Sequence, residues 1–210
     1  MTSSKIRVPR FDAYERVMHW MSALSFLYAA LTGLAIWSPK LYWLAGIFGG
    51  GIVIGGTHPW SGVFFSAAIG WMFFRWSKVM RLDADDRVWL TRLHKYASHR
   101  HSDLPESGRF NAGQKMLFWS QMVTTLLLFA SGIVLWFPEW MPRNLRLVAI
   151  ALHPLAAIGS IGGIIVHIYM GTAAVPHSMR AMLGGTVGPE WARFHHPKWY
   201  RQWRNSSNIR

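Results

Sequence analysis

Four histidines near the ends of apolar segments are the residues of this chain best suited to chemistry inside a membrane: His19, His58, His153 and His167. The last two lie fourteen residues apart in the uncharged run from Leu147 to Val175. In an α-helix this spacing places both imidazoles within about 40° of one face and about 21 Å apart along the axis. Ionisable side chains are expensive to bury in a bilayer, so a pair placed in this way indicates a function.

The elements that must position these histidines are four charge-free segments. Hydrophobic residues make up 51% of the 210 residues, and the 13 tryptophans are unusually many for a small soluble domain. Each segment is long enough to cross about 30 Å of hydrocarbon. They cover residues 17–37, 41–74, 116–137 and 147–175. The sequence therefore predicts an all-α membrane protein, a bundle of four transmembrane helices in a single domain over residues 1–210.

The second segment is longer than one helix needs, and its first half is rich in glycine, which lowers helix propensity. We interpret Leu41–Thr57 as an external connection, with a re-entrant segment as the alternative, and we expect the helix to begin near His58-Pro59. Pro154 either kinks the fourth helix or marks a later start for it. The predicted spans are 17–37, 58–76, 116–137 and 147–175, with a loop over 77–115 and a tail over 176–210.

The lysines and arginines predict the orientation of the bundle. Of the 22 in the chain, all but Lys40, Arg143 and Arg146 lie on the side that carries both termini. The positive-inside rule therefore places the N-terminus and the C-terminus in the cytoplasm. The net charge of +13 is mainly a topology signal, and no soluble basic face indicates nucleic-acid binding.

The histidines sort into two pairs when the chain is followed through the membrane, His58 with His153 near the outer face and His19 with His167 near the inner face. The chain contains no cysteine, which excludes thiolate metal sites, protein-ligated iron–sulfur clusters and covalently attached haem. Two neutral imidazoles from facing helices can ligate a haem iron axially. We expect two haem b groups stacked across the bilayer; the alternative for any single histidine is a hydrogen bond to a carbonyl.

The other histidines are interpreted as solvated residues of the loop and the tail. They are His94, His99, His101, His177, His195 and His196. The group from His94 to His101 has no acidic or cysteine partner at a metal-binding spacing, and proton delivery to a nearby site is a better use for it.

The segment Phe110–Lys115 precedes the third predicted helix and combines Asn111, Gly113 and Gln114 with a lysine. A quinone needs hydrogen-bond donors for its carbonyls inside an otherwise apolar pocket, and these amides could supply them. The alternative is that Asn111 only caps the helix, because asparagine is a favoured N-cap residue.

Several stretches of the chain resemble the gamma subunit, a b-type cytochrome, of membrane-bound respiratory formate dehydrogenases. The similarity runs from about Arg7 to Arg204, and its most specific pieces are FNAGQKMLFWS at 110–120, His58-Pro59, the spacing of His153 and His167, and HHPKWYR at 195–201. The resemblance implies that His58 and His153 ligate an outer haem and that His19 and His167 ligate an inner one. It also implies a quinone beside the inner haem, near Asn111, Gly113, Gln114 and His167.

The same resemblance implies partners and a location. An iron–sulfur beta subunit and a molybdenum or tungsten alpha subunit would oxidise formate, and this chain, not itself catalytic for that oxidation, would reduce menaquinone or ubiquinone on the cytoplasmic side. It implies a multi-pass protein of the bacterial inner membrane, surrounded by lipid and assembled into higher-order oligomers. The rival interpretations are a cytochrome b of a related hydrogenase or thiosulfate reductase, a haem-free membrane anchor, and a transporter; the spans lack the carboxylates that would favour a transporter.

Overall fold

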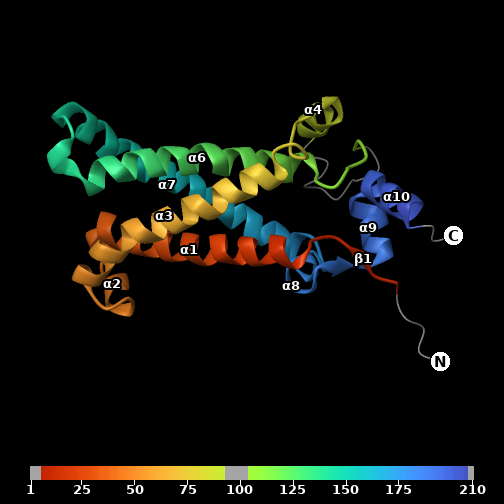
Figure 1. Ribbon diagram of the computed structural model, residues 1–210, viewed down its shortest axis with the longest axis horizontal. Helices are drawn as coiled ribbons and strands as arrows, with labels where there is room; N and C mark the ends of the chain where they lie inside the picture. The colour runs from red at the N-terminus through yellow and green to blue at the C-terminus, as the bar shows by residue number, and fades with distance from the viewer. Residues whose placement is uncertain (1–5, 93–103, 208–210) are drawn as a thin grey trace. The chain divides into compact units, whose positions relative to one another are not determined.

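The computed structural model describes residues 6–92 and 104–207, which form helices and one two-stranded sheet (Figure 1). The chain divides into two compact units. The membrane unit comprises Val17–Phe74 and Ser120–His167. The polar unit takes in the other described residues, near both ends of the chain and between the second and third long helices.

Four helices have the length and the apolar composition needed to cross a membrane: α1 (Ala13–Trp37), α3 (Gly51–Trp76), α6 (Ala112–Trp136) and α7 (Arg143–Tyr169). The protein is therefore a multi-pass membrane protein. No more than 28% of the most apolar stretch of any of these helices is buried within the chain, so much of their surface is left for other molecules to cover.

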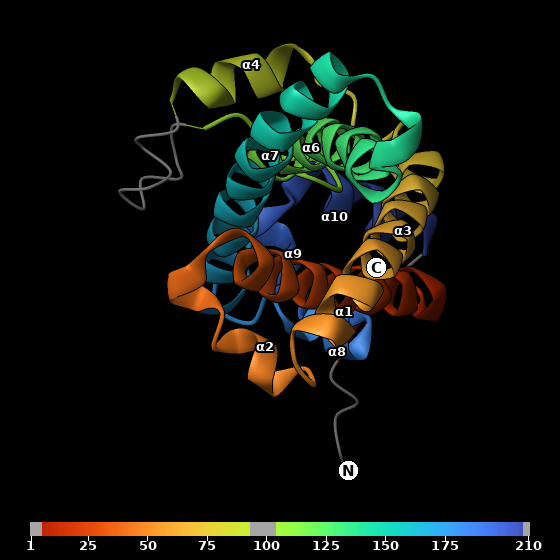
Figure 2. The same ribbon diagram turned by 90° about the vertical axis from the view of Figure 1, so that its left-hand side faces the viewer.

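Within the membrane unit the four helices follow one another around a bundle in the order α1, α3, α6, α7 (Figure 2). Each neighbouring pair shares a side-chain contact. These contacts are Phe26–Phe65, Trp60–Trp136, the hydrogen-bonded pair Gln121–Ser160, and His167–His19.

Helix α3 begins earlier than the sequence predicts. A 3₁₀ turn (Pro39–Leu41) and the short helix α2 (Leu44–Ile47) follow α1, and α3 then starts at Gly51, so the predicted connection is wrong for 51–57. The low helix propensity of glycine is measured in water. It does not prevent a helix here, because a backbone in hydrocarbon must satisfy its own hydrogen bonds. The chain turns at Gly49 and Gly50, whose φ angles of 88° and 96° suit glycine.

Both prolines of the long helices lie inside them. Pro59 is in α3 and Pro154 is in α7, which begins at Arg143, so the later start considered for the fourth helix is wrong. Each proline leaves one carbonyl without its helical partner, and membrane helices tolerate this where neighbours compensate. After Tyr169 the chain continues through a π-helical turn, Met170–Ala174.

The polar unit joins the two ends of the chain. Strand β1 (Val8–Pro9) pairs antiparallel with β2 (Thr186–Val187), with Val8 opposite Val187. Gly185 precedes β2 at a φ of 75°, and a Cβ there would lie 2.7 Å from the carbonyl oxygen of Phe11. The remaining helices are α4 (Ala84–Thr91), α8 (Arg180–Gly184), α9 (Pro189–His195) and α10 (Pro197–Ser206).

Candidate functional site

The membrane unit brings the four predicted histidines together as two pairs. His58 on α3 faces His153 on α7 with ring centroids 6.3 Å apart, and His19 on α1 faces His167 on α7 with centroids 6.1 Å apart. Two imidazoles that bind one metal ion from opposite sides, with metal–nitrogen bonds of about 2.0–2.1 Å, have centroids about 6 Å apart. The separation in both pairs therefore fits one six-coordinate iron between the rings.

Hydroxyl groups from neighbouring helices hold the rings of the His58–His153 pair. Thr32 Oγ1 lies 3.0 Å from His58 Nδ1, and Ser131 Oγ lies 2.9 Å from His153 Nδ1. Each hydroxyl also donates to a carbonyl of its own helix, Thr32 to Tyr28 at 2.7 Å and Ser131 to Leu127 at 2.6 Å.

These backbone bonds favour one tautomer of each histidine ring. A hydroxyl has a single hydrogen, so a Thr32 or Ser131 hydroxyl that donates it to a carbonyl can only accept from the histidine. Nδ1 is then the protonated nitrogen of His58 and of His153, and Nε2 keeps its lone pair free. A neutral imidazole in this tautomer is ready to bind a metal through Nε2.

A glycine follows each of these hydroxyl residues and lets the histidine approach its neighbouring helix. A Cβ on Gly33 would lie 3.0 Å from His58 Cε1, and a Cβ on Gly132 would lie 3.4 Å from His153 Cε1. Thr32-Gly33 on α1 and Ser131-Gly132 on α6 thus hold the two rings in the same way. None of these four residues is predicted from the sequence, because the same kind of dipeptide also occurs in α3 as Ser61-Gly62, where nothing lies close to the glycine.

The His19–His167 pair has different surroundings. His19 Nδ1 is buried, yet it has no hydrogen-bond partner in the described part of the chain. The planes of the two rings are inclined by 55°, compared with 74° in the His58–His153 pair. Burying this nitrogen without a hydrogen-bond partner costs free energy, which distinguishes His19 from His58 and His153.

A buried polar contact separates the two pairs along α7. Ser160 lies seven residues from His153 and from His167 and is fully buried. Its hydroxyl donates to Gln121 Oε1 at 2.7 Å, and Gln121 Nε2 donates to the Ser160 carbonyl at 3.2 Å. Because every group in this exchange is satisfied, it fixes α6 against α7 without offering a further ligand.

Asn111 and Gln114 form a reciprocal capping box at the start of α6. Asn111 Oδ1 accepts from the Gln114 backbone N–H at 2.9 Å, and Gln114 Oε1 accepts from the Asn111 N–H at 3.0 Å. Asn111 therefore caps the helix through its side-chain oxygen, and Gln114 completes the capping box. Neither amide nitrogen has a partner among residues 6–92 and 104–207, so both remain available as donors.

Packing does not require glycine at position 113, because a Cβ there would make ordinary contacts of 3.5 Å with Asn111 and Trp89. Asn111, Gly113 and Gln114 belong to the polar unit, whereas His167, the residue expected beside them, belongs to the membrane unit.

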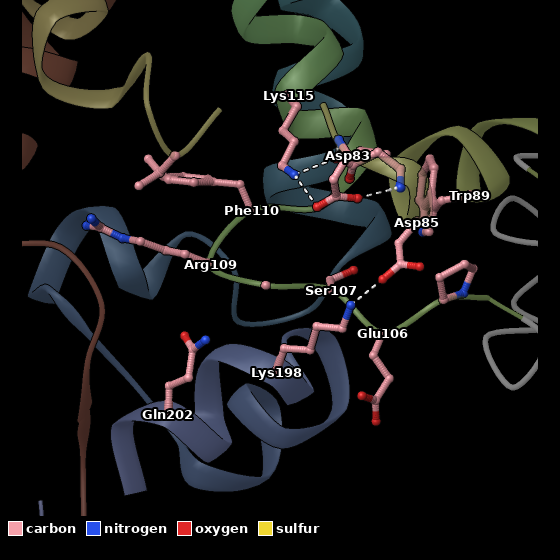
Figure 3. A pocket seen from close by; sticks show the side chains of 15 residues that line it. Asp83, Asp85, Trp89, Glu106, Ser107, Arg109, Phe110, Lys115, Lys198 and Gln202 are labelled. Atoms are coloured by element: carbon pink, nitrogen blue, oxygen red, sulfur yellow. Dashed lines mark hydrogen bonds and ion pairs between the residues drawn. The ribbon is translucent and has the colours of Figure 1, made fainter. Parts of the chain in front are cut away.

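A cavity of about 330 Å³ lies next to this segment in the polar unit (Figure 3). Lys115 is buried in its wall and donates to Asp86 at 2.5 Å and to Asp83 at 3.5 Å, while Lys198 pairs with Asp85. The backbone N–H of Asp86 lowers the pKa of Asp83, with a smaller effect of Lys115 in the same direction. The hydrogen bond from Lys198 to Asp85 raises the pKa of Lys198. The Asp83 carboxylate is therefore held ionised.

His196 differs from the solvated residue that the sequence predicts. It is only 2% exposed, its Nδ1 lies 2.8 Å from the Gly108 carbonyl, and its Nε2 accepts from Arg10 at 2.9 Å. Arg10 is itself buried, with Trp199 and Trp191 within 4.9 and 5.4 Å of its guanidinium carbon. Burial lowers the pKa of Arg10 to about 9, and burial with the nearby Arg10 charge lowers the pKa of His196 well below 6.5.

The other histidines outside the spans contribute less. His177 is exposed, as the sequence predicts, and has a φ of 65°. His195 is half-buried and contacts Trp191. The predicted loop histidines His94, His99 and His101 lie outside the described residues.

Four membrane-spanning helices and two facing imidazole pairs define a membrane cytochrome of the b type, and comparison with known proteins agrees. The prokaryotic cytochrome b561 family matches residues 10–185, so the chain belongs to this family. It is 34% identical to the formate dehydrogenase cytochrome b556(fdo) subunit of Escherichia coli (strain K12), over 95% of each chain. It is 32% identical to the nitrate-inducible cytochrome b556(Fdn) subunit of the same organism, over 96% of this chain and 94% of the relative. The formate dehydrogenase cytochrome b556 subunit of Haemophilus influenzae is also 32% identical, over 95% of this chain and 85% of the relative.

Proposed function

We propose that this chain is the membrane cytochrome subunit of a formate dehydrogenase complex and that it delivers electrons to a quinone reduced at the cytoplasmic face. The observation that carries the proposal is the pair of imidazole separations, 6.3 Å and 6.1 Å, each contributed by two different helices. The names of the relatives support formate as the electron donor.

His58 and His153 hold the outer haem b in this proposal, and His19 and His167 hold the inner one. When bound, the haem irons supply one-electron redox chemistry. The protein keeps the ligands neutral by placing them in apolar spans, so that their lone pairs face the metal instead of a proton. With two imidazoles as ligands, each haem would be closed to oxygen, which suits electron transfer.

The quinone is proposed to bind where Asn111 and Gln114 present their amide nitrogens. The capping box uses their oxygens and thereby orients the two NH₂ groups as donors for a quinone carbonyl. Reducing the quinone at the cytoplasmic face consumes protons there, so each electron carried inward is equivalent to a charge crossing the membrane. A full crossing costs about 2.3 kcal/mol per 100 mV, which the redox drop from donor to quinone must exceed.

The partners and the location follow from the same resemblance. We propose an iron–sulfur subunit at the outer face as the electron donor to this chain, and a molybdenum or tungsten subunit as the site of formate oxidation. The lysine and arginine distribution supports cytoplasmic termini in a bacterial inner membrane. A higher-order oligomer of the complex is part of the proposal.

Haem quantification on ligand variants tests this proposal. We expect two haems per chain in the purified complex, one in His153→Ala and one in His167→Ala. His177→Asn is the matched control and should keep both, because His177 is exposed and asparagine tolerates its left-handed backbone. Two haems in His153→Ala, or none in the unaltered complex, would overturn the proposal.

A further inference from the structure

The two histidine pairs differ in what accepts the hydrogen on Nδ1. In the His58–His153 pair each Nδ1 lies within hydrogen-bond distance of a hydroxyl, at 3.0 Å for Thr32 and 2.9 Å for Ser131, and donates to it in the tautomer that leaves Nε2 free. In the His19–His167 pair, His19 Nδ1 is buried without a partner in the described residues. The two pairs therefore differ in the residues that contact the histidines, although all four proposed ligands are histidines.

We propose that Thr32-Gly33 and Ser131-Gly132 are matched positioning elements that orient the ligands of the outer haem and make it the more reducing of the two haems. The inference rests on the proposed function, since it assumes a haem at each pair. It goes beyond that function by assigning these two dipeptides a role in directing electrons from the outer haem to the inner haem.

Hydrogen bonding through Nδ1 provides the physical reason. An imidazole that donates from Nδ1 becomes a more basic ligand at Nε2, which stabilises the oxidised iron and lowers its reduction potential. Each hydroxyl here also donates to a carbonyl at 2.6–2.7 Å, and donation of this kind strengthens the hydroxyl oxygen as an acceptor. Both histidines that would hold the outer haem make this contact, so their effects on its potential would act in the same direction.

Among residues 6–92 and 104–207 nothing makes this contribution to His19 of the inner pair, so the haem there is expected to have the higher potential. Electrons that enter at the outer face then move towards the quinone in the favourable direction. The alternative is that Thr32 and Ser131 only satisfy the backbone of their own helices, as such residues commonly do in membrane helices.

Four variants distinguish the two roles. Thr32→Val keeps the side-chain shape and removes the hydroxyl, and Ser131→Ala does the same with the loss of one atom. Thr32→Ser is the matched control because it keeps the hydroxyl. The double variant Thr32→Val with Ser131→Ala removes both acceptors.

Potentiometric titration of the two haems in the intact complex is the measurement, with the outer haem identified as the step missing from His153→Ala. We expect the midpoint of the outer haem to rise in each single variant and further in the double variant, while the inner haem stays unchanged and Thr32→Ser matches the unaltered protein. The ferric low-spin EPR signal of the outer haem should shift as well, because its anisotropy follows the angle between the ligand planes, 74° in this pair.

Unchanged midpoints in all the variants, or equal shifts of both haems, would overturn the inference while leaving two haems in place. Loss of the outer haem in Thr32→Val but not in Thr32→Ser would support the positioning role. The effect on the midpoint potential of the outer haem would then be measured in Ser131→Ala. Failure of the proposed function is distinct, because it appears as missing haem in the unaltered complex.

Discussion

The His58–His153 pair and the His19–His167 pair have nearly equal ring separations but unequal surroundings. Two hydroxyls and two closely approaching glycines hold the rings of the first pair, whereas Nδ1 of His19 in the second pair has no partner in the part of the chain that the structure describes. The difference shows that the spacing of histidines along the helices is enough to bring ligands together. The neighbouring helices decide the tautomer and the orientation of each ring.

Among the substitutions that disturb one histidine pair and not the other, the largest effect is expected at Gly33. Gly33→Ala would place a methyl group 3.0 Å from His58 Cε1, tighter than nine in ten real Cβ contacts, so the ring must shift by a few tenths of an ångström and a large part of the outer haem should be lost. Gly132→Ala leaves 3.4 Å to His153 and should lower the haem content less. Overpacking of this kind costs about 1–3 kcal/mol.

The measurement for the glycine variants is the haem-to-protein ratio, with the melting temperature of the complex recorded alongside. Gly62→Ala in α3 is a matched control, since no described atom, apart from its chain neighbours and the backbone of its own helix, lies within 4 Å of the position that its Cβ would occupy. If Gly33→Ala and Gly62→Ala retain the same amount of haem, the close approach of α1 to His58 has no role in binding.

An intermediate effect, on quinone reduction, is expected from Asn111→Asp. This variant should leave both histidine pairs and their haems intact, so it separates the quinone site from the two haem sites. Aspartate keeps the oxygen that caps α6 and removes the amide donor, so the helix remains stable while quinone reduction slows. We expect at least a tenfold loss of quinone reductase activity, in line with about 1.4 kcal/mol for a lost hydrogen bond.

Steady-state assays with formate and a soluble quinone analogue, together with haem quantification, check this expectation. Gln114→Glu applies the same test to the other amide, because glutamate keeps the second oxygen of the capping box. Full activity in both variants would mean that the two residues only cap the helix.

Parts of the fold and the site were predictable from local patterns. Runs without charge define the four spans, and fourteen residues between His153 and His167 are enough to place both on one face of α7. The start of α3 was not predictable in this way, because glycine-rich 51–56 has low helix propensity in water and the membrane overrides it.

Features that depend on contacts between distant segments could not be predicted. His196 lies in a tail rich in charged residues, which predicts a solvated side chain. Its burial depends on a contact with Arg10, 186 residues away in the sequence. Thr32 and Ser131 likewise have unremarkable neighbours in sequence, and their role depends on rings from the adjacent helices.

The smallest effect is expected in the polar unit, away from both histidine pairs. Burial lowers the pKa of His196 well below 6.5, so the folded chain keeps it neutral while the unfolded chain takes up a proton near pH 6.5. Its contribution to stability is therefore present above about pH 6.5 and is lost as the pH falls towards the lowered folded-state pKa.

Hydrogen exchange of the amides around β1, β2 and α9 between pH 7.5 and about pH 5 would detect this loosening. His196→Gln cannot titrate and should flatten the pH dependence. An identical acid response in the variant would exclude His196 as its cause.

A density map of the purified complex tests the central claim most directly, because it shows what lies between the facing rings. We predict flat porphyrin density between His58 and His153 and again between His19 and His167, with each iron bound by two imidazole nitrogens. Density that closes either pair into a direct ring-to-ring contact, with no group between, would contradict the account.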